Sequence, residues 1–184
     1  MKRNKKVALT ATALSLSALL AACGGEETTS SGDGEKELDL LITSEPPSLH
    51  PQLASDTTSG AILESTFEGL TTMVEGEPVL AAAEDYKVSD DLLTYTFTLR
   101  DAQWSNGEKV TAEDFAYAWK WALNPENASE YSTILYPIKG AEEYNNGVGT
   151  AEDVAINVID EKTLEVTLNA PTPYFLELTA FKTF

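Results

Sequence analysis

Hydrophobic and polar residues alternate most regularly over residues 94–100. Tyr95, Phe97 and Leu99 occupy every second position, and threonines lie between them. Because successive side chains of a strand point to opposite faces, this pattern predicts a strand with one buried face. Further apolar segments of strand length predict the strands 38–42, 84–88, 154–159 and 163–168. We expect the segments before and after residues 89–91 to form one antiparallel hairpin, and the last two strands to form another.

The strongest helical pattern follows Thr111. Thr111 and Asp114 have the spacing of a capping box, and Phe115, Trp119 and Leu123 then recur on one face. This pattern predicts a helix whose apolar face, with Trp119, lies in the core.

Three weaker patterns predict further helices. One begins at an N-cap supplied by Asp56, Thr57 or Thr58 and ends at Gly69. The other two helices are expected over 140–146 and 174–184. The second of these runs to the last residue without a stop signal, so we expect the chain to continue beyond it. Residues 75–78, with the sequence Glu-Gly-Glu-Pro, are expected to form a turn.

Hairpins and helices mix along the chain without a repeating βαβ unit, which favours a mixed α/β or α+β fold. Two groups of aromatic residues are candidates for ligand contact rather than core packing. Trp121 lies off the apolar face of the helix after Thr111, and Tyr131 and Tyr136 follow that helix in a loop-like stretch. Packing is the alternative for each of them.

The N-terminal residues have the pattern of a secretory signal. A basic head over residues 2–6 precedes an apolar stretch from Val7 to Leu20 that includes threonine and serine. A membrane anchor needs about 20 apolar residues, so this stretch is too short and too polar to be a good one. Leu20-Ala21-Ala22-Cys23 resembles the lipobox of bacterial lipoproteins.

The lipobox resemblance implies that residues 1–22 are a signal peptide and that the Cys23 thiol carries a diacylglyceryl group after cleavage. A plain signal peptide with an incidental cysteine is the alternative. Residues 24–37 contain no apolar side chain. We therefore expect 23–37 to be a lipid-anchored, flexible tether.

The charge of the chain excludes one large class of partners. The chain has 30 acidic and 12 basic residues and a formal net charge of −18. Four of the basic residues and none of the acidic ones precede Cys23, so the charge from Cys23 onward is −22. Such a surface repels nucleic acid and anionic lipid head groups, and we expect no nucleic-acid partner.

The sequence lacks the residues that most catalytic and metal sites need. Cys23 is the only cysteine and His50 the only histidine, which excludes a disulfide within the chain, a zinc–thiolate site and a multi-histidine metal site. No phosphate-binding glycine loop or serine-nucleophile motif is present. His50 has neither an orienting carboxylate nor a nucleophile beside it in the sequence. We expect no catalytic residue, metal or cofactor, and a packing role for His50.

Six short segments resemble, in order, the oligopeptide-binding proteins of bacterial ABC importers, which are solute-binding proteins of the extracellular family 5 type. They are residues 44–51 (SEPPSLHP), 67–70 (FEGL), 95–100 (YTFTLR), 104–107 (WSNG), 110–115 (VTAEDF) and 163–168 (TLEVTL). Each segment is weak by itself, but the ordered set covers nearly all of the chain after Cys23.

The resemblance implies a mixed α/β, periplasmic-binding-protein-like clamshell of the class II, or cluster C, type. Residues 38–73 and 169–184 would be parts of a discontinuous first lobe, and 74–168 would be the small domain that distinguishes peptide binders. The opposite lobe, with the aspartate that pairs with the amino terminus of the peptide, would lie beyond Phe184.

The resemblance also implies a set of peptide contacts. Ser55, Asp56, Thr57 and Thr58 match a loop of the first lobe that offers backbone groups to the peptide. Tyr131 matches a tyrosine of the small domain that faces the binding cleft. Peptide would be held much like a strand added to a sheet.

The function that follows from the resemblance is transport rather than catalysis. We expect a monomeric receptor, lipid-anchored on the extracytoplasmic face of the cell membrane of a Gram-positive bacterium. It would capture oligopeptides and deliver them to the permease and ATPase subunits of an ABC importer. The alternatives are the same fold with another solute (a nickel chelate, a sugar or a signalling peptide), adhesion or pheromone sensing without an importer, and a secreted lipoprotein hydrolase that uses His50.

Overall fold

The structure is a computed structural model that describes residues 39–42 and 44–184. The predicted signal peptide (1–22), the predicted lipidation site Cys23 and the predicted tether (23–37) lie outside the described residues. The chain divides into two units after Leu40, and the elements described below all belong to the second unit, Leu41–Phe184.

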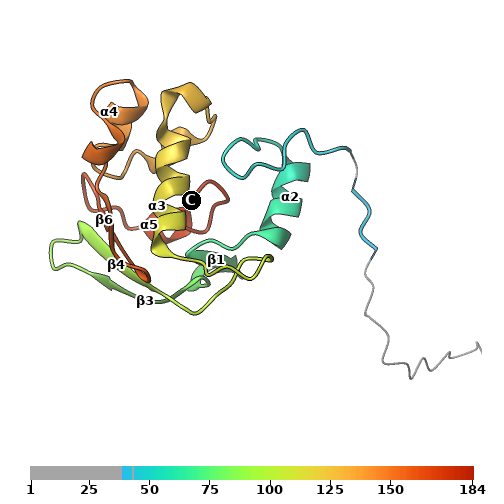
Figure 1. Ribbon diagram of the computed structural model, residues 1–184, viewed down its shortest axis with the longest axis horizontal. Coiled ribbons are helices and arrows are strands. Elements are labelled where there is room, and N and C mark those ends of the chain that lie inside the picture. Colours follow the sequence, from blue (N-terminus) through green and yellow to red (C-terminus); the bar gives the residue numbers. More distant parts are fainter. Residues whose placement is uncertain (1–38, 43) are drawn as a thin grey trace, which may run out of the picture. The chain divides into compact units, whose positions relative to one another are not determined.

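A four-stranded antiparallel sheet with the order β3–β4–β6–β5 runs through this unit (Figure 1). Its strands are β3 (Ala83–Val88), β4 (Thr94–Leu99), β5 (Ile156–Asp160) and β6 (Thr163–Thr167). In the central pair, Phe97 of β4 lies opposite Leu164 of β6, and Tyr95 lies opposite Val166. Both predicted hairpins are confirmed, and the pairing of β4 with β6 joins them into one sheet.

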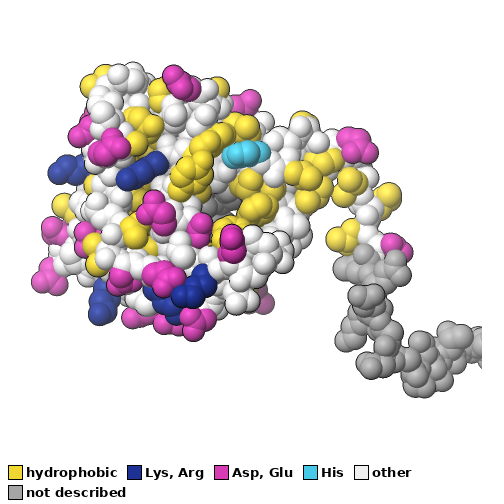
Figure 2. Space-filling model, in the orientation of Figure 1, with side chains coloured by type: hydrophobic (Ala, Val, Ile, Leu, Met, Phe, Trp, Pro, Cys, Tyr) yellow, Lys and Arg dark blue, Asp and Glu magenta, His cyan; other side chains and the backbone are white. Residues whose placement is uncertain are grey.

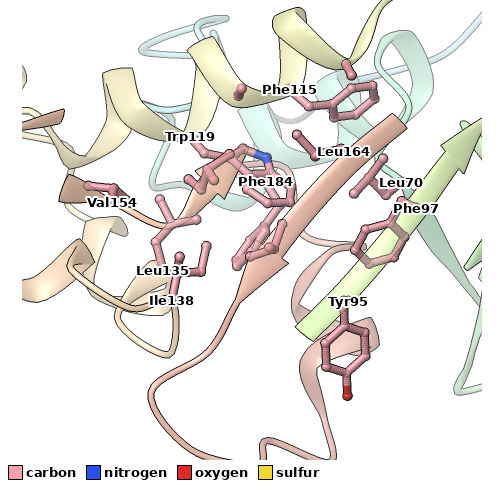
Figure 3. Packing of buried hydrophobic residues seen from close by; sticks show 14 of the residues in the cluster. Leu70, Tyr95, Phe97, Phe115, Trp119, Leu135, Ile138, Val154, Leu164 and Phe184 are labelled. Carbon is pink, nitrogen blue, oxygen red and sulfur yellow. The ribbon is translucent and has the colours of Figure 1, made fainter. Parts of the chain in front are cut away.

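The apolar face of this sheet packs against the helix α3 (Ala112–Leu123). Figure 3 shows side chains from α3 and from the sheet meeting in the core. Trp119 of α3, Phe97 and Leu164 are completely buried there. Truncating a buried tryptophan costs about 3–5 kcal/mol, so the α3–sheet contact is a main source of stability.

The start of α3 has the predicted capping box. The Asp114 carboxylate accepts hydrogen bonds from the Thr111 backbone N–H at 2.7 Å and from the Thr111 hydroxyl at 2.9 Å. These bonds fix the entry of the chain into α3.

A second, two-stranded sheet was missed by the sequence analysis, which predicted only a turn over 75–78. β1 (Thr71–Val74) and β2 (Glu77–Leu80) form a hairpin. Its two turn residues, Glu75 and Gly76, have φ values of +53° and +88°. Positive φ at both central positions is typical of a tight two-residue hairpin turn.

The helix α2 (Thr57–Thr66) begins at Asp56, one of the three predicted N-caps. It ends at Phe67, whose extended backbone leaves the helix before the predicted stop at Gly69. Gly69 has a different role, because a Cβ atom there would lie 2.7 Å from the carbonyl oxygen of Thr179. A glycine therefore allows two distant segments to approach each other.

The remaining helices are short. They are the α-helices α4 (Ala141–Asn145) and α5 (Phe175–Leu178) and the 3₁₀ helices η2 (Pro125–Asn127), η3 (Ser132–Leu135) and η4 (Ala151–Asp153). The prediction of a helix over 140–146 is confirmed. In the part of the chain that the structure describes, no helix has the length and apolar character needed to cross a membrane.

Two further predictions were wrong. The helix expected over 174–184 is limited to α5, because the chain then turns so that Phe184 packs edge-on against Trp119, with 5.0 Å between ring centroids. Residues 39–42 form no strand and are exposed. A strand needs a neighbour to satisfy its backbone groups, and no strand of the described residues pairs with this apolar run.

Candidate functional site

The loop before α2, the segment after η2 and the C-terminal segment meet in one place. The hydroxyl of Tyr131 lies 3.5 Å from the carbonyl oxygen of Ser55, at the outer limit of a hydrogen bond. The ring of Phe181 packs against that of Tyr131 with 5.1 Å between centroids and an angle of 64°. We call Ser55, Asp56, Tyr131, Phe181 and Lys182 the Tyr131 cluster.

Lys182 is the cation of the Tyr131 cluster. Its Nζ atom lies 4.5 Å from the ring centroid of Tyr131 and 4.1 Å from that of Phe181. Partial burial lowers the pKa of Lys182, whereas the nearby carboxylates of Glu64 and Asp56 raise it. Burial is the larger of these effects on the pKa.

A partly buried hydrogen bond holds the loop before α2 against the segment that carries Tyr131. The hydroxyl of Ser129, which is only 6% exposed, donates to the carbonyl oxygen of Gln52 at 2.5 Å. The loop itself is a tight turn, because the N–H groups of Leu53 and Ala54 both donate to the carbonyl oxygen of His50. These bonds place Ser55 beside Tyr131.

Asp56 is committed to the start of α2. Its carboxylate accepts hydrogen bonds from the Ser59 hydroxyl at 2.5 Å and the Ser59 N–H at 2.9 Å. Both bonds lower the pKa of Asp56, and the bond from the Ser59 hydroxyl has the larger effect. Its carboxylate therefore caps the helix, and the predicted contact with a peptide would use the backbone beside it.

The predicted contact residues thus divide into two groups. Ser55 and Asp56 lie in the Tyr131 cluster with Tyr131 itself. Thr57 and Thr58 belong to the first turn of α2, where the Thr58 hydroxyl lies 3.0 Å from that of Ser44. The structure contains no ligand, so the roles of all five residues in peptide binding stay predictions.

Phe181 and Lys182 were missed because the sequence analysis assigned them to a helix. The apolar spacing of 174–184 suggested a buried face, and only Glu177 and Lys182 are charged within it. A lysine next to an aromatic residue in an otherwise apolar segment was the signal that could have identified this position.

His50 packs on an aromatic surface. Its ring stacks on that of Trp121, with 4.4 Å between centroids and an angle of 28°. Figure 2 shows hydrophobic side chains on both sides of the histidine. No described side chain forms a hydrogen bond with its imidazole, so neither a nucleophile nor an orienting carboxylate is in place.

Trp121 is half-buried and belongs to a surface depression beside α3. With Tyr117, Lys120 and Val158 it lines an open pocket of about 530 Å³ between α3 and β5. Tyr136 is partly buried and packs against the core, and its hydroxyl donates to Asn145 at 2.8 Å. Within residues 39–42 and 44–184, no three acidic, histidine or cysteine side chains are grouped to hold a metal.

Comparison with known proteins decides the family. The model of the bacterial extracellular solute-binding proteins, family 5 (middle part), matches residues 77–183, more than half of the chain. The chain belongs to this family. The oligopeptide-binding resemblance is thereby confirmed, and so is the mixed α/β, periplasmic-binding-protein-like fold, of which this chain covers a part.

Curated family 5 proteins resemble nearly the whole chain. Oligopeptide-binding protein OppA of Bacillus subtilis is 52% identical over 90% of this chain and 32% of its own length. Dipeptide-binding protein DppE of the same organism is 41% identical over 97% of this chain and 35% of its own length. The chain thus spans about a third of the length of the curated relatives it matches.

Solved structures of family 5 proteins have the same fold. The substrate-binding domain of an oligopeptide ABC transporter from Bacillus anthracis has a TM-score of 0.74 and 43% identity, over 76% of this chain and 27% of that one. Listeria monocytogenes OppA bound to peptide has a TM-score of 0.73 and 40% identity, over 74% of this chain and 28% of that one.

The hydrogen bond between Ser129 and Gln52 can be tested directly. Replacing Ser129 with alanine leaves a carbonyl oxygen without its partner, which costs about 1–3 kcal/mol for a buried group. We expect faster amide hydrogen exchange at Leu53 and Ala54 in the Ser129→Ala variant. Thr133→Ala, at an exposed position of η3, is the matched control and should exchange like the wild type. Equal exchange in all three proteins would contradict this role of Ser129.

Proposed function

We propose that the full-length protein is an extracytoplasmic substrate-binding protein that captures oligopeptides and delivers them to the permease of an ABC importer. The observation that carries this proposal is the contact between Tyr131 and Ser55. These residues lie 76 positions apart, and the family resemblance implies a peptide contact for each of them. They meet in a chain that is 52% identical to an oligopeptide-binding protein.

The chemistry of the Tyr131 cluster suits reversible peptide capture. The backbone around Ser55 can exchange hydrogen bonds with a peptide backbone, and such bonds do not depend on the peptide sequence. Tyr131 adds an amphipathic ring that can pack against a side chain and still use its hydroxyl. The cluster contains no nucleophilic side chain with a general base beside it. We therefore propose that the protein has no enzymatic activity.

We also propose the domain boundaries that the resemblance implies. Residues 38–73 and 169–184 would belong to one lobe and 74–168 to the small domain. Hydrogen bonds across the two pieces of the lobe support this assignment. The hydroxyl of Thr71 lies 2.7 Å from the carbonyl oxygen of Leu176 and 2.8 Å from the hydroxyl of Thr179.

A second candidate function keeps the fold and changes the solute. Relatives of this chain include a probable deoxycholate-binding periplasmic protein of Escherichia coli, 36% identical, and a protein whose structure is titled pheromone receptor PrgZ, 39% identical. The proposal of oligopeptides as the ligand is favoured because the relatives with the higher identities are named for oligopeptides and dipeptides.

Peptide binding is tested with the full-length protein. We expect mixtures of short peptides to raise its unfolding temperature, because a ligand that binds only the folded state stabilises it. Tyr131→Ala should weaken affinity by roughly tenfold, whereas Tyr117→Ala, a tyrosine on the exposed side of α3, should leave it unchanged. Isothermal titration calorimetry measures both. If the wild-type protein binds no peptide but a bile acid or a metal chelate raises its unfolding temperature, the second candidate function is supported and this proposal is wrong.

Membrane attachment is tested at Cys23. We propose that Cys23 is lipidated and holds a monomeric receptor beside its permease and ATPase subunits. Cys23→Ala should release the protein into the medium and abolish incorporation of labelled palmitate in the native bacterium. Normal retention of the Cys23→Ala variant in the membrane fraction would overturn the lipid anchor.

Gel filtration with light scattering would report the oligomeric state, with a monomer expected.

A further inference from the structure

Lys182 differs in its surroundings from the three ion-paired basic residues of the described chain. Arg100, Lys109 and Lys162 each form an ion pair, with Glu68, Glu161 and Asp101 respectively. Lys182 instead places its ammonium group over the rings of Tyr131 and Phe181. Within the described residues, no carboxylate lies at ion-pair distance from it and no oxygen accepts a hydrogen bond from it.

The nearest acidic side chains do not satisfy this ammonium group. Asp56 and Glu64 are close enough to affect the pKa of Lys182 but form no ion pair with it. The carboxylate of Asp56 is held at the start of α2 by two hydrogen bonds from Ser59 and lies beyond ion-pair distance of Lys182. Lys182 therefore keeps hydrogen-bond donors that a ligand can use.

The aromatic surroundings make an anion a favourable partner. Two rings remove part of the water around the ammonium group, and a charge that has lost water gains more from a partner of opposite sign. The rings also restrict the long side chain, so less conformational entropy is lost on binding.

We propose that Lys182 binds a carboxylate of the peptide that occupies the Tyr131 cluster and thereby favours peptides with an acidic group at that position. This inference rests on the proposed peptide-binding function. It adds a specificity-determining residue to a part of the protein, residues 23–184, whose net charge of −22 would otherwise disfavour acidic ligands.

A purely structural role for Lys182 makes a different prediction. A cation over two rings stabilises the fold by about 0.5–1 kcal/mol at a partly exposed site. If packing were its only role, removing the charge would change thermal stability without changing the ratio of affinities for acidic and neutral peptides.

The test compares peptide pairs that differ by one charge. Alanine pentapeptides with glutamate or glutamine at each position in turn are titrated into the full-length protein by calorimetry. A second series with an amidated C-terminus separates a side-chain carboxylate from the terminal one. Four proteins are compared: the wild type, Lys182→Gln, Lys182→Arg and Lys87→Gln. Lys87 lies on strand β3, and Lys87→Gln is the control that removes one positive charge elsewhere in the protein.

We expect a peptide with a carboxylate at one particular position, or at its C-terminus, to bind the wild type about three- to tenfold more tightly than its neutral counterpart. This is the gain expected from a partly exposed, charge-assisted hydrogen bond. Lys182→Gln should lose this preference, Lys182→Arg should retain most of it, and Lys87→Gln should match the wild type. Thermal unfolding curves check that each variant is folded.

Two failures are distinguishable. If the wild type binds the peptides but Lys182→Gln has the same ratio of affinities at every position, the role of Lys182 is overturned and peptide binding stands. If the wild type binds no peptide in either series, the proposed function itself fails, and the inference fails with it.

Discussion

The docking of the C-terminal segment onto residues 69–71 is the contact on which the candidate site depends. Thr71 is 2% exposed, and its hydroxyl lies within hydrogen-bond distance of two groups of the segment 176–179. Gly69 allows the backbone of Thr179 to approach closely. Phe175 and Phe184 are both buried in the core, with 6.1 Å between their ring centroids. A buried polar group that loses its partner costs about 1–3 kcal/mol, so the segment is strongly held in this position.

The site is a consequence of that docking. Once the C-terminal segment is fixed, Phe181 and Lys182 lie against Tyr131, and the bond from Ser129 brings the loop before α2 to the same ring. Three segments that are far apart in the sequence thus supply a backbone, an aromatic ring and a cation. Under the proposed function, these groups would recognise features that many peptides share, and that suits a receptor that binds and releases its ligand.

Local patterns predicted most of the elements, whereas the contacts between them could not be predicted locally. The alternation around Phe97 and the capping box at Thr111 each depend on a few neighbouring residues, and both were confirmed. The hairpin β1–β2 was missed because its strands are short and largely exposed. The helix expected over 174–184 was wrong because the burial of Phe184 against Trp119, a tertiary contact, overrides helical spacing. The roles of Ser55 and Tyr131 came from resemblance, since nothing in their spacing indicates that they meet.

The central claim is that a bound peptide lies against the Tyr131 cluster. A crystal structure of the full-length protein with a bound oligopeptide tests it most directly. The account predicts peptide backbone atoms within hydrogen-bond distance of residues 55–58 and a peptide side chain in contact with the ring of Tyr131. A peptide bound elsewhere, with Tyr131 and Ser55 in contact only with each other, would contradict it.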